Sequence, residues 1–112
     1  MSNPLIEPGR RLVIAHRGAS SEAPENTLES FRLGMSQGAD ALEMDVRLTR
    51  DGQVVVIHDP TLDRTTDRTG AVAELTLEQV QAADAGSGAR IPTFRSVLEA
   101  FPRTPLPAPR WP

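Results

Sequence analysis

Several ingredients of common binding and structural sites are missing from this chain of 112 residues. There is no cysteine, which excludes a disulfide framework and any thiolate-bound metal. Aromatic residues make up only 4%, and no apolar run approaches the roughly 20 residues of a membrane-spanning helix. The net charge of −3 offers no basic surface for nucleic acid. We therefore expect a small cytoplasmic domain with no signal peptide and no nucleic-acid partner.

The N-terminal half of the chain predicts a strand, a helix and a second strand. Residues 12–15 form a short apolar run that is typical of a buried strand. We expect the helix to begin after an N-cap at Asn26, with Glu29 in the capping-box position, and to end near Gly38. Its apolar stripe consists of Leu28, Phe31 and Met35. Residues 41–48 alternate as a second strand, and this order of elements predicts the α/β class.

The C-terminal half is predicted to contain less regular secondary structure. Residues 54–57 read as a third strand, and Thr76 with Gln79 predicts a capping box for a short helix. Thr93 is expected to cap a last helix, whose core side consists of Val97, Leu98 and Phe101. We interpret the loop with Asp63, Arg64, Asp67 and Arg68 as a solvated surface. Residues 102–112 hold five of the ten prolines and cannot form a central strand.

Two carboxylates stand on one face of the second predicted strand. Glu43 and Asp45 point the same way because side chains alternate across a strand. Two adjacent carboxylates repel each other, and a hard divalent cation such as Mg²⁺ or Ca²⁺ would offset that repulsion. The plain alternative is that this face is simply exposed to solvent.

A hairpin between the second and third strands would bring a histidine to these carboxylates. If Asp51 and Gly52 are the two turn residues, Asp45 lies directly opposite His58, with Cβ atoms roughly 5 Å apart. A register shifted by one residue would break this pairing. The expected register therefore predicts His58 beside Asp45.

Three further candidates follow the first strand, where loops carry catalytic groups in many α/β proteins. His16 and His58 are the two histidines, and such a pair can serve as general acid and general base. The planar fork of Arg17 suits a phosphate oxygen, and Gly18 would let the backbone approach a ligand. The alternative is a structural role: each histidine or Gly18 could serve only in a turn, and Arg17 could cover the end of a helix. Together with the carboxylates, these groups suit metal-assisted cleavage of a phosphodiester.

The order of these short motifs resembles the glycerophosphodiester phosphodiesterase family. The motifs are His16–Gly18, Pro24–Thr27, Glu43–Val46, Thr49–Gly52, Val55–Asp59 and Leu62–Thr66, followed by Ile91-Pro92-Thr93. We interpret residues 12–101 as the N-terminal part of such a domain, residues 1–11 as a lead-in and residues 102–112 as a proline-rich tail outside the family pattern.

The resemblance implies a TIM (β/α)₈ barrel and a role in phospholipid and glycerol metabolism. The implied reaction is metal-dependent hydrolysis of glycerophosphodiesters to an alcohol and glycerol 3-phosphate. It implies that His16 and His58 are the acid–base pair, that Arg17 holds the phosphate, and that Glu43 and Asp45 bind Mg²⁺ or Ca²⁺. It also implies that residues 59 to about 91 are an insertion capping the active-site mouth.

The chain departs from the family pattern near Leu106. A complete barrel typically needs about 250 residues, and the third metal-binding Glu and the phosphate-binding Lys that the resemblance implies are replaced by proline-rich sequence. We therefore expect a partial barrel without its C-terminal half, from a truncated or frameshifted gene, that self-associates through the unpaired barrel edge. The alternatives are an inactive remnant, a non-catalytic binding fragment, or a related phosphatidylinositol-type phospholipase.

Overall fold

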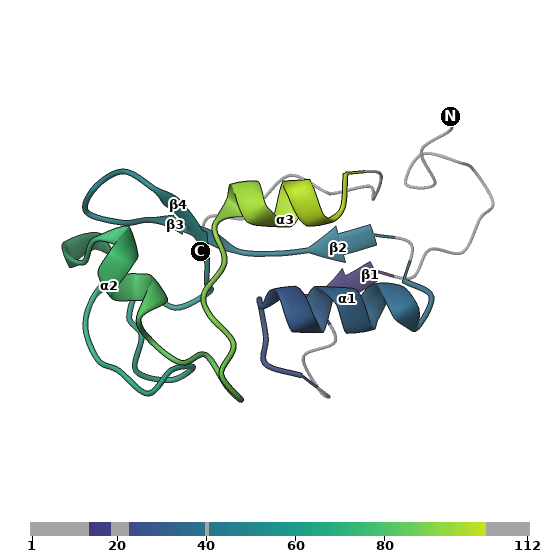
Figure 1. Cartoon of the computed structure of the whole chain (residues 1–112), viewed down its shortest axis with the longest axis horizontal. Helices are drawn as coiled ribbons and strands as arrows, with labels where there is room; N and C mark the ends of the chain where they lie inside the picture. The colour runs from purple at the N-terminus through teal and green to yellow at the C-terminus, as the bar shows by residue number, and fades with distance from the viewer. Residues whose placement is uncertain (1–13, 19–22, 40, 103–112) are drawn as a thin grey trace.

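The structure, a computed structural model, describes residues 14–18, 23–39 and 41–102, and residues 14–16 through their backbone alone. Strand β1 (Ile14–His16) pairs in parallel with β2 (Ala41–Glu43), and helix α1 (Leu28–Ser36) connects them (Figure 1). The predicted strand–helix–strand unit and the α/β class are confirmed. The expected lead-in and residues 103–112 of the expected tail lie outside the described residues.

Helix α1 begins one residue later than predicted. Thr27 is the N-cap, and its side chain accepts a hydrogen bond from the Ser30 backbone N at 3.2 Å. The Ser30 hydroxyl oxygen in turn accepts a hydrogen bond from the Thr27 backbone N, which completes a capping box. The expected cap at Asn26 and box at Glu29 are wrong, because Asn26 has a φ of 56° and lies outside the extended region of an N-cap. The helix stops before Gly38 as predicted, with Gln37 as its C-cap.

The predicted strand 41–48 is divided into two strands with different partners. Its first part, β2, pairs with β1, whereas β3 (Val46–Leu48) pairs antiparallel with β4 (Val54–Val56). The switch occurs at Met44 and Asp45. Leu42, Met44 and Val46 share one buried face as expected, but Leu48 is 48% exposed. The two carboxylates therefore stand where the chain leaves one sheet for the other.

The hairpin register differs from the predicted one by a single residue. Val46 pairs with Val56, so Asp45 lies opposite Ile57, whose N donates to the Asp45 carbonyl oxygen at 3.0 Å. The reason is a loop of three residues, not two. Thr49 N donates to the carbonyl of Gln53, and Gly52, with a φ of 77°, completes a turn back to Thr49. The predicted pairing of Asp45 with His58 is wrong.

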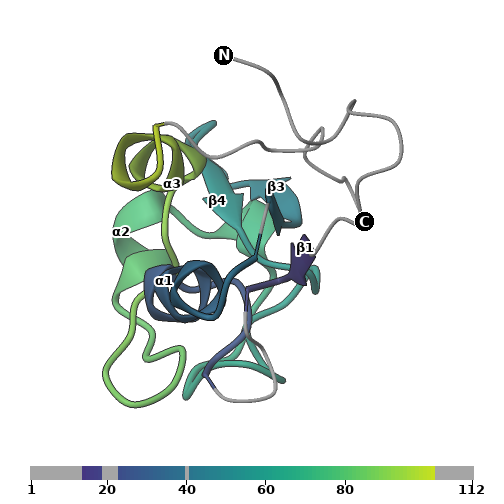
Figure 2. The ribbon, with the colours of Figure 1, turned by 90° about the vertical axis from the view of Figure 1, so that its right-hand side faces the viewer.

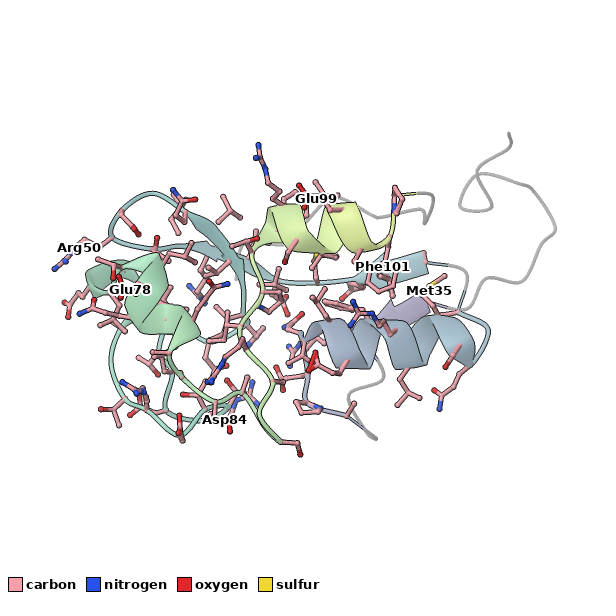
Figure 3. The ribbon with its side chains drawn as sticks, viewed as in Figure 1. Met35, Arg50, Glu78, Asp84, Glu99 and Phe101 are labelled. Atoms are coloured by element: carbon pink, nitrogen blue, oxygen red, sulfur yellow. The ribbon has the colours of Figure 1, made fainter. Side chains whose placement is uncertain are left out.

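Apolar side chains form two cores on opposite faces of β4. The first lies among α1, α3 (Phe94–Ala100) and the strands, and contains Phe31, Leu42, Met44, Val46, Val56 and Val97. The second contains Val55, Ile57, Leu62, Val72, Val80, Ala83, Ala85 and Ile91. Figure 3 shows Met35 and Phe101 between α1 and α3, whereas Arg50 and Glu99 project outward. Val55 and Val56 serve different cores because adjacent strand residues face opposite ways.

The segment between β4 and α3 builds the second core with little regular structure. It contains a 3-10 helix, η2 (Val72–Glu74), and helix α2 (Leu77–Gln81), whose predicted Thr76–Gln79 capping box is present. In the view of Figure 2, α1 and α3 lie to the left of β1 and β3. Thr93 caps α3 as predicted, but Leu98 is 41% exposed and Phe94 packs on the core in its place. Among the described helices, none is long and apolar enough to cross a membrane.

Gly18 lets the chain after β1 approach helix α1. Its φ is 76°, and a Cβ built there would lie 2.6 Å from the carbonyl carbon of Ser30, in the first turn of α1. Only a residue without a side chain fits this contact. The close approach that the sequence suggested is therefore made to a helix of the same chain.

We expect Gly18→Ala to destabilise the fold more than Gly52→Ala. Both glycines have a positive φ, but a Cβ at Gly52 meets nothing within 4 Å. Gly52→Ala should therefore lower the free energy of unfolding by about 1 kcal/mol through backbone strain, and Gly18→Ala by about 3 kcal/mol through strain and overpacking. Urea unfolding of both variants measures the difference, and equal losses would contradict the close contact with Ser30.

Candidate active site

The carboxylate of Asp45 is buried where the chain passes from β2 to β3, with 1% of the residue exposed. Asn26 donates its side-chain Nδ2 to Asp45 Oδ2 at 3.2 Å. Arg17 Nε lies 3.1 Å from the same oxygen, in an ion pair whose N–H is not aligned for a hydrogen bond. A buried carboxylate needs such partners because removing a charge from water is costly. Asp45 thus holds two groups from the segment that precedes α1.

Arg17 and Asn26 share an unusual backbone conformation. Arg17 and Asn26 have φ values of 55° and 56°, in the left-handed region that residues other than glycine seldom adopt. Asn26 N donates to the Arg17 carbonyl at 2.9 Å, and the Ser30 hydroxyl donates to the same oxygen at 3.2 Å. Arg17 N donates to the carbonyl of Glu43. This kind of strain is concentrated at functional sites, and here it directs Arg17 and Asn26 to Asp45.

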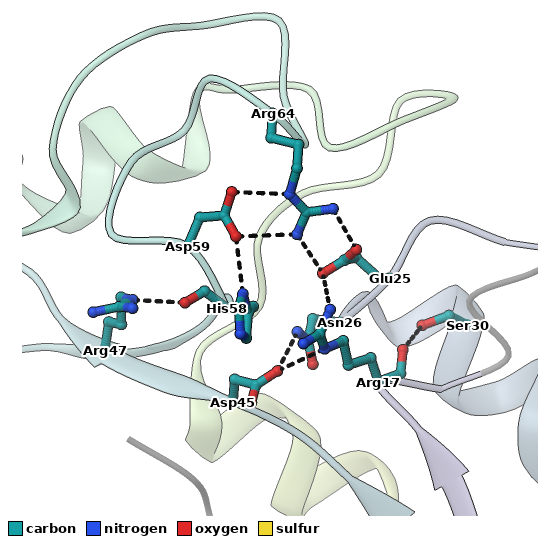
Figure 4. Close-up of polar contacts among 9 residues, drawn as sticks. All are labelled: Arg17, Glu25, Asn26, Ser30, Asp45, Arg47, His58, Asp59 and Arg64. Atoms are coloured by element: carbon teal, nitrogen blue, oxygen red, sulfur yellow. Dashed lines mark hydrogen bonds and ion pairs between the residues drawn. The ribbon is translucent and has the colours of Figure 1, made fainter. Parts of the chain in front are cut away.

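A second arginine, Arg64, joins the loop before α1 to the end of β4 (Figure 4). Its Nη1 and Nη2 donate to the two carboxylate oxygens of Glu25 at 2.9 and 3.0 Å. Its Nε and Nη2 donate to the two oxygens of Asp59 at 2.9 and 3.1 Å. Glu25 also lies 3.5 Å from Arg17 Nη1. One guanidinium therefore bridges two carboxylates that are 34 positions apart in sequence, as the numbers of Glu25 and Asp59 show.

His58 reaches the site although the predicted register is wrong. It follows β4 in a bend, so strand alternation does not set its direction. Its Nδ1 lies 2.9 Å from Asp59 Oδ1, and its carbonyl oxygen accepts a hydrogen bond from Arg47 Nε at 2.9 Å. In the view of Figure 4, the opposite edge of the ring points toward Asp45. The bend after β4, and not cross-strand pairing, therefore sets the direction of the His58 side chain.

These contacts place most of the predicted site residues in one network. Contacts run from Asp45 through Arg17, Glu25, Arg64 and Asp59 to His58. Glu43 is half-buried at the end of β2, where its backbone pairs with that of His16; the His16 side chain lies outside the described part of the structure.

Four members of the network were not predicted as site residues: Glu25, Asn26, Asp59 and Arg64. All four lie in motifs that carried the family resemblance, and Asp59 directly follows His58. The interpretation of Arg64 as part of a solvated loop was incomplete, because its side chain is 51% exposed yet binds two carboxylates. Nothing in its local sequence indicates a partner 39 positions away.

The segment 59–91 lies against this network. A small cavity of about 10 Å³ lies between this segment, the loop before α1 and the end of β4. It is lined by Glu25, Asn26, Thr27, Val56, Ile57, His58, Thr65, Ala85 and Ile91. A volume of about 10 Å³ is enough for at most one water molecule. Gly86 also lies close to Pro24, because a Cβ there would approach the proline ring to 2.6 Å. The segment therefore packs tightly against the loop before α1.

Asp59 and Arg64 are titratable groups of this network whose pKa values their neighbours clearly shift. Hydrogen bonds from Arg64, and then from His58, lower the pKa of the Asp59 carboxyl from 3.8 to about 2. The same contacts with Glu25 and Asp59 raise the pKa of Arg64. Asp59 is therefore ionised throughout the neutral range and accepts hydrogen bonds only.

Oxygen donors for a cation are present at the buried end of the network. The candidates are the carboxylates of Glu43 and Asp45 and the side-chain oxygen of Asn26, which is buried without a hydrogen-bond partner among the described residues. Hard cations such as Mg²⁺ and Ca²⁺ prefer such oxygens. Among the side chains that the structure describes, no three His, Asp or Glu residues converge as a metal site. The residues present thus fit part of a site for a divalent cation.

Comparison with known proteins identifies similar chains. Residues 16–106 match the model of the glycerophosphoryl diester phosphodiesterase family. A glycerophosphodiester phosphodiesterase of Caldanaerobacter subterraneus subsp. tengcongensis is 50% identical over 97 residues, which cover 80% of this chain and 40% of that protein. The crystal structure of a glycerophosphodiester phosphodiesterase from Agrobacterium tumefaciens is similar with a TM-score of 0.83 at 40% identity, over 87% of this chain and 46% of that one.

The structure of a phosphodiesterase from Oleispira antarctica in complex with the product sn-glycerol-3-phosphate is similar with a TM-score of 0.81 at 40% identity. The match covers 86% of this chain and 42% of that one. The chain spans about 40% of the length of the first relatives it matches. These matches confirm the predicted fold class, in which the chain is an α/β part of a TIM barrel.

We expect the Asp59 carboxyl to titrate near pH 2 in the folded protein, because Arg64 and His58 stabilise its ionised form. Arg64→Gln should move that pKa back toward 3.8. Since the folded pKa is the lower one, the stability contributed by Asp59 is present above pH 3.8 and is lost as the pH falls toward 2. Carboxyl ¹³C titration by NMR measures this, with Arg68→Gln as the control. An Asp59 pKa that Arg64→Gln leaves unchanged would contradict the assignment.

Proposed function

Because this chain belongs to the glycerophosphodiester phosphodiesterase family, we propose that it carries the acid–base and phosphate-binding part of a site that hydrolyses glycerophosphodiesters to an alcohol and glycerol 3-phosphate. The observation that carries the proposal is the network from Asp45 to His58, which joins groups from five separate motifs. The glycerol 3-phosphate product is supported by the complex of the similar Oleispira antarctica phosphodiesterase.

In the proposed reaction, His16 and His58 divide the proton transfers. One imidazole takes the proton of the nucleophile, either water or the neighbouring glycerol hydroxyl, as its oxygen bonds to phosphorus. The other gives a proton to the alcohol oxygen as the phosphorus–oxygen bond to the alcohol breaks. When the glycerol hydroxyl attacks, water then opens the cyclic phosphodiester, so both routes give an alcohol and glycerol 3-phosphate.

Arg17 is proposed to bind a phosphate oxygen through its guanidinium. Its backbone is fixed by the bonds to Glu43, Asn26 and Ser30, and its side chain lies beside two carboxylates. Those carboxylates orient the planar fork before a substrate arrives, so less conformational freedom is lost on binding.

Glu43 and Asp45 are proposed to hold a divalent cation, Mg²⁺ or Ca²⁺, with the Asn26 side-chain oxygen beside them. When bound, the cation would neutralise charge on the phosphoryl oxygens. The further Glu and Lys that the resemblance implies would come from chain beyond this sequence or from a second copy, and self-association through the open edge is part of the proposal. The cytoplasmic location also stays a prediction.

A non-catalytic fragment that binds a glycerophosphodiester is the second candidate. The observation that favours it is that no third acidic ligand joins Glu43 and Asp45 among the described side chains. The phosphatidylinositol-type alternative has no such support, because the match over residues 16–106 is to the glycerophosphodiester family.

We expect the purified chain to release glycerol 3-phosphate from glycerophosphocholine with Mg²⁺ or Ca²⁺, and to lose this activity with a chelator. His16→Ala should lower the rate by about 10²- to 10⁴-fold, the usual range for loss of a proton-transfer group. Glu43→Ala should also lower the rate, because it removes a proposed cation ligand. A coupled enzyme assay for glycerol 3-phosphate measures the rate.

Arg68→Gln is the matched control for this assay, because Arg68 lies on the same loop as Arg64 but outside the network. Activity that persists in chelator, or in both site variants, would contradict the proposed chemistry. Binding of glycerophosphocholine without turnover, by a chain shown to be folded, would favour the second candidate.

A further inference from the structure

We propose that Asp59 and Arg64 are positioning residues for His58: the Asp59 carboxylate holds the hydrogen of the neutral imidazole on Nδ1, so that Nε2 is the atom that exchanges protons in the site. This inference rests on the proposed function only in naming the reaction in which Nε2 of His58 would exchange protons. The arrangement itself is independent of substrate and metal, because it depends on three side chains of this chain.

The position of the hydrogen follows from the partner of Nδ1. Asp59 Oδ1 lies 2.9 Å from His58 Nδ1. An ionised carboxylate has no hydrogen to donate, so Nδ1 must be the donor. In a neutral imidazole this leaves Nε2 with a lone pair, and the partner of one ring nitrogen thus decides the chemistry of the other. The low pKa of Asp59, about 2, keeps its carboxylate ionised throughout the range in which imidazole titrates.

Arg64 fixes the direction of that carboxylate. Its Nε and Nη2 bind both Asp59 oxygens, so the carboxylate plane cannot rotate without breaking two charge-assisted bonds. The other side of the guanidinium is tied in the same bidentate manner to Glu25. A lysine ammonium has three donors at one point and cannot reproduce this double fork.

The backbone of His58 is restrained independently. Arg47 Nε donates to its carbonyl oxygen, which anchors the residue to the face of β3. With the backbone held by Arg47 and Nδ1 held by Asp59, the free edge of the ring can point only away from Asp59. Figure 4 shows that this edge is directed toward Asp45. His58 is therefore oriented from two sides before any ligand binds.

The arrangement also couples His58 to the proposed phosphate-binding group. Glu25, the second partner of Arg64, lies 3.5 Å from Arg17 Nη1. Arg64 itself comes from the segment 59–91, which packs against the loop before α1. One side chain of this segment thus sets the direction of both an acid–base group and an anion-binding group.

The test is the tautomer of His58 in the ¹⁵N-labelled full chain, without substrate or metal. Long-range ¹H–¹⁵N correlation spectra of the imidazoles distinguish the two nitrogens, and the signals lost in His58→Gln identify the residue. At a pH where the ring signals no longer change, we expect the hydrogen of His58 on Nδ1. Asp59→Ala should return His58 to the mixed tautomers of a solvent-exposed histidine, and Arg64→Gln and Arg64→Lys should shift it the same way.

Arg68→Gln is the control and should leave the tautomer unchanged. A neutral His58 with its hydrogen on Nε2 in the unmodified chain would overturn the proposal, and this measurement needs no variant to fold. A merely structural ion pair predicts that Arg64→Gln lowers the urea midpoint but preserves the Nδ1 hydrogen, which would remove Arg64 from the proposal. Because no turnover is measured, failure of this inference and failure of the proposed hydrolysis are separate results.

Discussion

The carboxylate of Asp45 is buried between two strand pairs, and the site is organised around the need to compensate that charge. Leaving a buried charge without its partner costs about 3–5 kcal/mol, so the chain must bring donors to it. Arg17 and Asn26 arrive from one loop, both in a left-handed backbone conformation. Gly18 then allows that loop to lie against α1. A single buried acid thus fixes the path of the chain before the helix.

The segment 59–91 is held to this loop by two kinds of force. Its apolar side chains share a core with Val55 and Ile57 of the hairpin, and this burial stabilises its position because apolar area leaves water. The contacts of Arg64 with Asp59 and Glu25 are half-exposed, and such ion pairs contribute little net stability. These ion pairs instead fix the orientation of the Asp59 and Glu25 carboxylates. Through these carboxylates they orient the side chains of His58 and Arg17.

Local sequence was sufficient for most features whose interaction partners are close along the chain, although it placed the N-cap of α1 one residue too early. The caps at Thr76 and Thr93, the stop at Gly38 and the apolar stripe of α1 depend on contacts within a few residues, and all were predicted. The hairpin register failed at the same scale for a specific reason. Asp51-Gly52 is compatible with a two-residue or a three-residue loop, and the Thr49–Gln53 bonds select the longer one. The one-residue difference moved Ile57 into the place expected for His58.

The sequence by itself determined the family, the α/β class and the presence of His58, Arg17 and Asp45 at the ends of strands, because ordered motifs and apolar periodicity are local properties. Only the tertiary structure decided how these groups meet. The bend after β4 turns His58 toward Asp59. Arg64 then joins Asp59 to Glu25, which lies 39 positions before Arg64 in the sequence. Such contacts cannot be derived from local pattern, because they depend on the two cores that place the segments side by side.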